Sequence, residues 1–89
     1  MSPTAKTSCL ARLRRGEGQV RGIARMVTED RYCIDILTQL RAVREALKRV
    51  EDEILKDHVT HCVEDAVASA DTGRRRRVVA ELVDVLERR

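Results

Sequence analysis

The chain has 89 residues, which is enough for one small domain that buries only a limited core when it folds alone. It carries 18 basic and 15 acidic residues for a net charge of +3, has Tyr32 as its single aromatic residue, and lacks any run of 18 apolar residues, which argues against a membrane-spanning helix. Charged residues make up 37% of the chain and helix breakers are few, so the composition indicates charged helices that associate with one another.

The first third of the chain predicts one helix behind a short arm. Residues 1–8 hold the only proline, and we expect them to form a flexible arm ahead of a single helical domain over residues 9–89. Apolar residues recur every three or four positions over residues 9–28, which is the period of a helix packed along one face. Residues 29–31 indicate a polar turn, in which Asp30 is a plausible N-cap of the next helix.

The rest of the chain predicts a long helix and a short one. Residues 31–71 contain neither glycine nor proline and keep the same apolar spacing, which predicts one long central helix. Residues 72–73 are expected to end it, and the four arginines at 74–77 form a basic connector or a first helical turn. Apolar spacing then predicts a third helix over residues 79–86. The predicted fold class is all-α, with three helices per chain.

Cys33, His58 and Cys62 are the most informative side chains. His58 and Cys62 are four residues apart, so they lie one turn from each other on a helix and can bind one ion. Cys33 falls within about 20° of the same face, but about 38 Å away along the helix axis. The three donors therefore meet only when two copies pair antiparallel. This geometry predicts a two-fold dimer with two equivalent metal sites and a seam centred near Ala46 and Leu47.

The donor set favours a soft metal ion. Two thiolates and an imidazole suit three-coordinate Cu(I), whereas Zn(II) normally takes a fourth ligand. His61 could supply that ligand, but its direction diverges from that of His58 by about 60°. Alternatively, Cys33 and Cys62 are small buried hydrophobic residues and His58 is a surface residue. The N-terminus lacks an apolar signal core, so we expect a cytoplasmic protein whose cysteines are reduced.

Basic residues gather toward the two ends of the chain. Residues 1–30 and 73–89 each carry six basic side chains against three acidic ones, whereas residues 31–72 carry six against nine. Arginine outnumbers lysine fifteen to three, and its planar fork binds phosphate oxygens bidentately. This distribution favours phosphate binding, although rows of charge also form ordinary solvated helix faces, and charge alone leaves the two interpretations equal.

Other features point away from catalysis. Gly16, Gly18 and Gly22 do not form a dinucleotide fingerprint, because no strand precedes them and the spacing differs. We expect them to allow close helix approach or a bend. Cys9 could be an auxiliary ligand, but we interpret it as the buried start of the first helix. No nucleophile, base and acid are arranged together, so we expect neither an enzyme nor a small-molecule substrate.

Several short motifs resemble those of the copper-sensitive operon repressor (CsoR) family. The resemblance covers about residues 10–70, with a weaker match around Glu81 and Leu82. It implies an all-α repressor without a helix-turn-helix, in which antiparallel four-helix-bundle dimers assemble into a dimer of dimers. It also implies that the apo protein holds operator DNA and that the ligand releases it. The residues that carry the resemblance are Arg12-Leu13-Arg14-Arg15, Glu17-Gly18-Gln19-Val20-Arg21-Gly22-Ile23, Tyr32-Cys33-Ile34-Asp35, Asp57-His58 and His61-Cys62-Val63.

The resemblance also implies roles for single residues. Cys33, His58 and Cys62 stand at the ligand positions of the Cu(I) sensors. The persulfide-sensing branch lacks the histidine, the formaldehyde branch lacks the second cysteine, and the nickel and cobalt branch adds an N-terminal histidine that this chain does not have. Tyr32 and Glu81 match positions that couple the metal to DNA affinity. The operator contacts that we expect are Arg12, Arg14, Arg15, Arg21 and Arg49.

The resulting hypothesis is a Cu(I)-responsive repressor that releases operator DNA on metal binding and so derepresses copper efflux or detoxification genes. The alternative is a thiol-switch repressor that senses persulfide or oxidant by joining Cys33 and Cys62 of different chains. A third hypothesis, of another class, is a helical metal-buffering or assembly protein that does not bind DNA. We expect double-stranded DNA and further copies of the chain as partners, in a homodimer or homotetramer, and no membrane.

Overall fold

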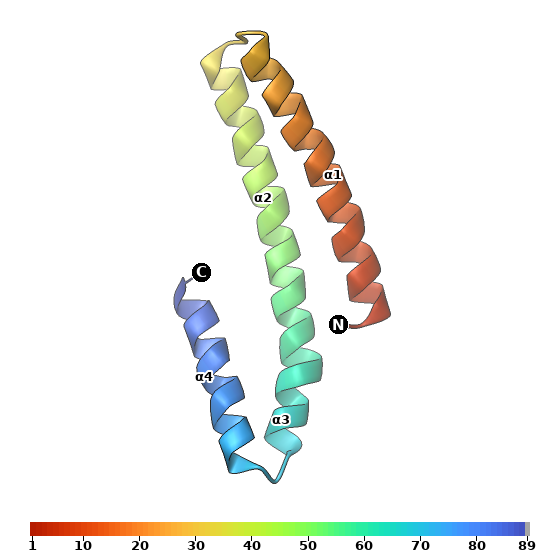
Figure 1. Cartoon of the computed structure of the whole chain (residues 1–89), viewed down its shortest axis with the longest axis vertical. Helices are drawn as coiled ribbons and strands as arrows, with labels where there is room; N and C mark the ends of the chain where they lie inside the picture. Colours follow the sequence, from red (N-terminus) through yellow and green to blue (C-terminus); the bar gives the residue numbers. More distant parts are fainter. Residues whose placement is uncertain (89) are drawn as a thin grey trace.

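The computed structural model describes residues 1–88, except for the side chains of Cys62 and Val63. Three helical rods make up this part of the chain, and it contains no strand, which confirms the all-α fold class (Figure 1). None of the described helices is long and apolar enough to cross a membrane. The elements in chain order are α1 (Pro3–Thr28), α2 (Cys33–His58), the π-helical turn η1 (Val59–Val63), α3 (Glu64–Ala68) and α4 (Thr72–Arg88).

Helix α1 begins earlier than the sequence predicted. Residues 3–8, which we expected in a flexible arm, form its first turns. Ser2 caps this helix, because its Oγ accepts a hydrogen bond from the backbone N–H of Ala5 at 3.2 Å. Pro3 occupies the start of the helix, where a missing N–H costs nothing and the fixed φ suits the helix. The arm prediction is wrong because it read this proline as a breaker.

A short turn joins α1 to α2 and folds the two helices antiparallel, side by side (Figure 1). Asp30 lies in this turn with φ 54°, a left-handed conformation that aspartate tolerates better than most residues. It is therefore not the N-cap that we expected. Tyr32 holds that position without a side-chain hydrogen bond, and Cys33 is the first residue of α2.

The long central helix is confirmed, with one feature that the sequence did not predict. Helix α2, η1 and α3 follow one another without a break from Cys33 to Ala68. The π turn at Val59–Val63 widens one turn of this rod and rotates the face that follows it. It begins directly after His58 and contains Cys62, so the irregular turn coincides with the predicted metal ligands.

Helix α4 begins before the arginine run. The Asp71 carboxylate accepts a hydrogen bond from the Arg74 backbone N–H at 3.1 Å and so caps the helix that starts at Thr72. Residues 74–77 therefore form its first turns, which confirms one of the two interpretations offered for them. The rod before it ends at Ala68, and Gly73 lies inside α4 rather than ending the long helix.

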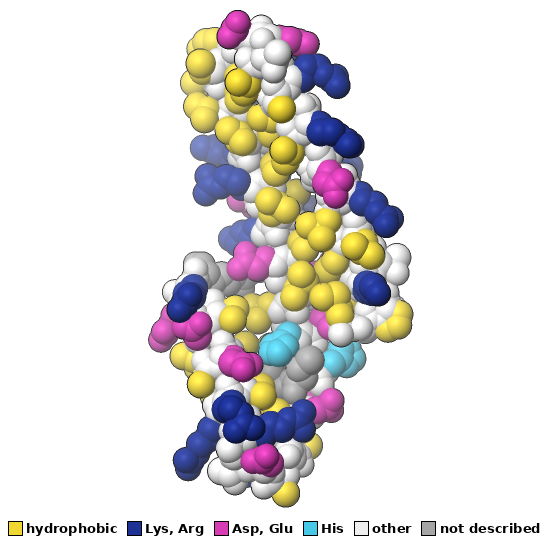
Figure 2. All heavy atoms as spheres, in the orientation of Figure 1, with side chains coloured by type: hydrophobic (Ala, Val, Ile, Leu, Met, Phe, Trp, Pro, Cys, Tyr) yellow, Lys and Arg dark blue, Asp and Glu magenta, His cyan; other side chains and the backbone are white. Residues whose placement is uncertain are grey.

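The packed helices leave much apolar surface open. The Cα atoms span 59 × 27 × 14 Å, so the molecule is an elongated slab that is thin in one direction. Helix α4 packs against η1 and α3, and α1 packs along α2. Hydrophobic side chains cover much of the α1–α2 pair on the face seen in Figure 2. The buried apolar residues are few and mostly small: Ala5, Cys9, Ile23, Val43, Val50 and Ala66.

Candidate metal centre and nucleic-acid interface

The predicted metal ligands lie at the two ends of one helix. Cys33 begins α2 and is exposed, and His58 ends it and is half-buried. At the usual rise, 25 helical steps separate the two residues by about 38 Å, so Cys33 and His58 of one chain cannot share an ion. Cys62 lies in η1, and its side chain is outside the described part of the structure. Among the side chains that are described, no three metal-binding residues of one chain gather into a site.

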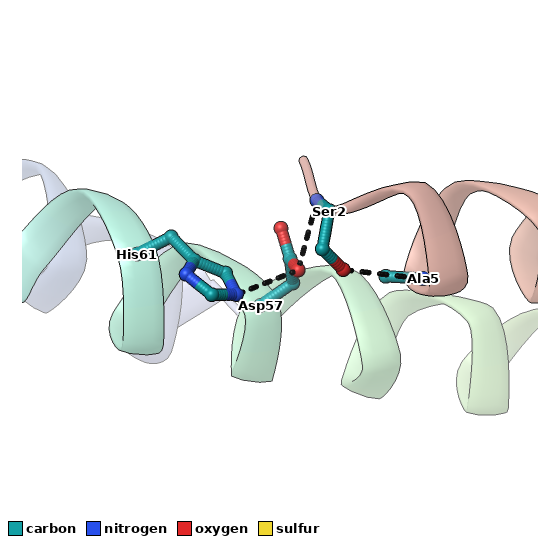
Figure 3. Close-up of polar contacts among 4 residues, drawn as sticks. All are labelled: Ser2, Ala5, Asp57 and His61. Atoms are coloured by element: carbon teal, nitrogen blue, oxygen red, sulfur yellow. Dashed lines mark hydrogen bonds and ion pairs between the residues drawn. The ribbon is translucent and has the colours of Figure 1, made fainter.

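Asp57, next to His58, ties the end of α2 to the start of α1 (Figure 3). Its Oδ1 accepts a hydrogen bond from the Ser2 backbone N–H at 3.2 Å, and the Nε2 of His61 lies 3.6 Å from the same oxygen. Burial alone would raise the pKa of Asp57, but the hydrogen bonds from Ser2 and the charges of His61 and the N-terminus lower it below its ordinary 3.8. His61 is therefore paired with an ionised carboxylate, which argues against it as a fourth ligand beside His58.

The two residues expected to support the metal site lie at opposite ends of α2. Glu81 of α4 lines the same groove as His58, between α2 and α4. Tyr32 precedes Cys33 at the other end of the helix, where it is 69% exposed. Each end of α2 thus carries one part of the predicted site and one expected supporting residue. An antiparallel pair of α2 helices places the two ends side by side.

Cys9 is a core residue. Only 4% of it is exposed, between α1 and α2. Burial, and then the nearby charge of Glu53, raises the pKa of the Cys9 thiol above its ordinary 9.0. A buried, neutral thiol packs as a small hydrophobic group, so the prediction that Cys9 is buried in the first helix is confirmed, although the helix starts earlier, at Pro3.

The five arginines expected to bind DNA divide between different faces. Arg12 and Arg15 of α1 and Arg49 of α2 line one groove between the two helices, which we call the basic groove. Arg21 borders a different, largely apolar groove, and Arg14 shares the Arg21 side of α1 at about 100° per residue. The structure therefore brings three of the five together. The basic groove is completed by Gln19, Ala42, Glu45 and Ala46.

Sequence reasoning gave no role to two residues of this region. The Oε1 of Gln19 is buried without a hydrogen-bond partner in the described structure, beside the arginines of the basic groove. Glu53 contacts α1 twice through Oε2, which accepts a hydrogen bond from the Ser8 hydroxyl at 3.0 Å and lies 3.5 Å from Arg12 Nε. The spacing of Ser8 and Arg12, one helical turn apart, would have placed both on the same face of α1.

The opposite side of the α1–α2 pair is apolar, and we call it the apolar side. At about 100° per residue, Leu40, Leu47 and Ile54 fall on one flank of the buried Val43–Val50 line, and the basic groove falls on the other. These three residues are 41%, 45% and 40% exposed. Large apolar side chains left this open form an apolar patch of the kind that is typical of protein interaction surfaces.

Known proteins resemble this chain over nearly its whole length. A family model described as metal-sensitive transcriptional repressor matches residues 5–88. The copper-sensing transcriptional repressor CsoR of Bacillus subtilis is 47% identical over 87 residues, which are 98% of this chain and 83% of that protein. The copper-sensing transcriptional repressor RicR of Mycobacterium tuberculosis is 56% identical over 68 residues, 76% of this chain and 71% of that protein. A crystal structure of the copper-sensing repressor CsoR with Cu(I) from Geobacillus thermodenitrificans matches with a TM-score of 0.87 and 39% identity, covering 99% of this chain and 88% of that one.

Proposed function

Because the chain belongs to the family of metal-sensitive transcriptional repressors, we propose that it is a Cu(I)-responsive repressor that holds operator DNA without metal and releases it when copper binds. The observation that carries this proposal is the match to relatives named as copper-sensing repressors at 47% and 56% identity. The protein is a regulator rather than an enzyme. As a regulator of copper efflux or detoxification genes, it acts in the cytoplasm, where its operator lies.

The metal ligands are Cys33 of one chain and His58 and Cys62 of a second chain. This assignment rests on the position of Cys33 and His58 at opposite ends of α2, which prevents a site within one chain. These three residues would hold Cu(I), because two thiolates and an imidazole are the soft donors that this ion favours. Tyr32 of the first chain and Glu81 of the second then lie beside the site, where they can report its state to the rest of the protein.

The second chain is a copy that packs antiparallel on the apolar side. In an antiparallel register that brings Cys33 to His58 and Cys62, Leu47 lies at the two-fold axis and faces its own copy. Leu40 of one chain then lies across from Ile54 of the other. The apolar groove between α2 and α4, lined by Leu47 and Ile54 among others, adjoins this seam and can receive side chains of the partner. A four-helix bundle of two chains follows.

Two such dimers form the homotetramer of the proposal. Helix α4 carries apolar side chains that the single chain leaves open, and these supply further contact area. Val79, Val83 and Leu86 are 47%, 47% and 50% exposed.

Operator DNA binds through phosphate contacts on the basic groove. Arg12, Arg15 and Arg49 line this groove, and their guanidinium groups suit phosphate oxygens. Arg14 and Arg21 extend the basic surface of α1 beyond it and stay predictions as DNA contacts. Release of DNA by copper requires that the metal bind more tightly to the state with weaker DNA contacts. The metal then lowers the affinity for DNA by the same free energy by which DNA lowers the affinity for the metal.

The test is an anaerobic Cu(I) titration of the reduced protein, followed by fluorescence anisotropy with its upstream DNA. One Cu(I) taken up per chain, with DNA released at the same stoichiometry, is the expected result. A Cys33→Ala variant should still bind DNA as apo protein but should no longer release it with copper. Copper uptake without any change in DNA affinity would refute the proposal. It would favour the alternative of a repressor that senses persulfide or oxidant, which no relative reported above supports.

A mixing experiment tests whether the site is shared between chains. Cys33→Ala and His58→Ala chains each lack an intact site as homodimers. When the two are mixed and refolded together, each heterodimer regains one complete site from the unmutated residues of its two chains. Random pairing then predicts tight uptake of about a quarter of a Cu(I) per chain. No uptake by the mixture would mean that the three ligands do not come from two chains.

A further inference from the structure

Polar contacts fasten α1 to the half of α2 that ends at His58. The Ser2 N–H donates to Asp57 at 3.2 Å, the Ser8 hydroxyl donates to Glu53 at 3.0 Å, and Arg12 Nε lies 3.5 Å from the same Glu53 oxygen. Glu53 and Asp57 are one helical turn apart, so both acids lie on the edge of α2 that faces α1. The start of α1 is thus attached to α2 within a few residues of the proposed metal ligands.

Glu53 holds Arg12 in a way that leaves it free to bind an anion. The contact uses Nε, whereas the terminal nitrogens carry the other four N–H donors of the guanidinium group. Arg12 is 45% exposed in its side chain and lines the basic groove with Arg15 and Arg49. The Ser8 hydroxyl bonds the same Glu53 oxygen, which limits the motion of the carboxylate. A restrained arginine loses less entropy when it binds a phosphate than a free one does.

We propose that Glu53 is a positioning residue that holds Arg12 at the basic groove and carries the state of the metal-binding turn to this DNA contact. The inference rests on the proposed function, because it takes Arg12 as a phosphate contact. Glu53 lies five residues before His58 on the same unbroken helix. Because Glu53 and His58 belong to one helix, a movement of the His58 end on metal binding would also move Glu53 and the guanidinium group that it holds.

The experiment is a Glu53→Gln variant of the full chain, tested for apo DNA binding by anisotropy over a series of salt concentrations. Removing an acid near DNA would by itself raise affinity, so a fall in affinity is the sign of lost positioning. We expect the affinity to fall about 5- to 20-fold and the slope of log K against log salt to shrink by about 0.9 for each chain that contacts DNA through Arg12, which is about 1.8 for a dimer. Cu(I) uptake should stay at one per chain.

Three further variants separate positioning from charge. Glu29→Gln makes the same change of net charge in the exposed turn between α1 and α2, and it should leave DNA affinity unchanged or slightly raised. In an Arg12→Gln background, Glu53→Gln should have no further effect, because the residue through which it acts is gone. Glu53→Asp, which keeps the charge on a shorter side chain, should recover part of the affinity.

Three outcomes would overturn the inference. The first is a rise or no change in DNA affinity with Glu53→Gln, and the second is an unchanged salt slope. The third is a loss of DNA affinity on Glu53→Gln that is as large in the Arg12→Gln background as in the wild-type chain. These outcomes are distinct from failure of the proposed function. That proposal is tested by the wild-type chain, which must bind DNA as apo protein and release it with Cu(I), whatever Glu53 does.

Discussion

Replacement of Leu47 by alanine should weaken the dimer more than it weakens the helices. Leu47 is 45% exposed in the single chain and lies on the proposed two-fold axis, so both copies lose the same contact. Full burial of a leucine side chain contributes about 1.5–3 kcal/mol, and covering the exposed part therefore contributes about 0.7–1.4 kcal/mol per chain. The two copies of Leu47 double this contribution to the dimer, and the methyl group of alanine retains a small part of it. The loss is about 1–2 kcal/mol, which weakens the dimer about 5- to 30-fold.

Sedimentation equilibrium of the metal-free protein at several loading concentrations measures this change directly. The matched control is Glu45→Ala on the same helix, because Glu45 lines the basic groove on the other side of the α1–α2 pair. It should leave the dissociation constant of the dimer unchanged. Circular dichroism of both variants, at a concentration where each is associated, checks that the helices are intact.

Cross-linking tests the register of the same contact. In a background with Cys33 and Cys62 replaced by serine, Leu47→Cys should form a disulfide-linked dimer on mild oxidation, because the residue faces its own copy. Leu40→Cys should not, since it lies across from Ile54. Association weakened by Glu45→Ala but not by Leu47→Ala would refute the reasoning, and so would cross-linking through residue 40 alone.

Three further predictions concern the single chain. Gly16→Ala should raise the free energy of unfolding by about 1 kcal/mol, because a Cβ at this position meets no atom within 4 Å. Gly73→Ala should raise it less, because its Cβ would lie 3.3 Å from an Asp71 oxygen. Thermal unfolding of the two variants measures the difference. Because the pKa of Cys9 is raised in the folded state, the folded chain keeps a thiol proton at a pH where the unfolded chain has lost it. The contribution of Cys9 to the free energy of unfolding is therefore fully present below about pH 9 and is lost as the pH rises further. Cys9→Ala should flatten the fall in melting temperature between about pH 8 and pH 10. Iodoacetamide should label exposed Cys33 well before buried Cys9, as peptide mass spectrometry would show, and equal rates would contradict the packing of α1 on α2.

Much of the fold could be predicted from the spacing of apolar residues. That spacing depends on which face of a helix is buried, and it identified α1, the long central rod and α4. The start of α1 was missed because the prediction treated Pro3 as a helix breaker, although a serine followed by a proline is a typical helix start. The π turn was missed because Val59–Val63 contains neither glycine nor proline, the residues that usually mark an irregular turn in a sequence.

The candidate site was predictable only where one helix determines it. Cys33 and His58 belong to the same helix, so their separation followed from the rise per residue alone. The contact between Glu53 and Arg12 depends on how far α1 is shifted along α2. The spacing of apolar residues within each helix does not determine that shift. The same holds for the basic groove, whose arginines come from two helices.

The slab has a consequence for how the protein survives in a cell. No large side chain of the described chain is fully buried, so in the proposed dimer much of the hydrophobic core forms only when the partner packs on the single copy. In that dimer folding and association use the same apolar surface, so dilution would destabilise the folded chain. A cell that makes more of this repressor therefore both occupies more operators and keeps each molecule folded for longer, while scarce chains are the ones that proteases remove first.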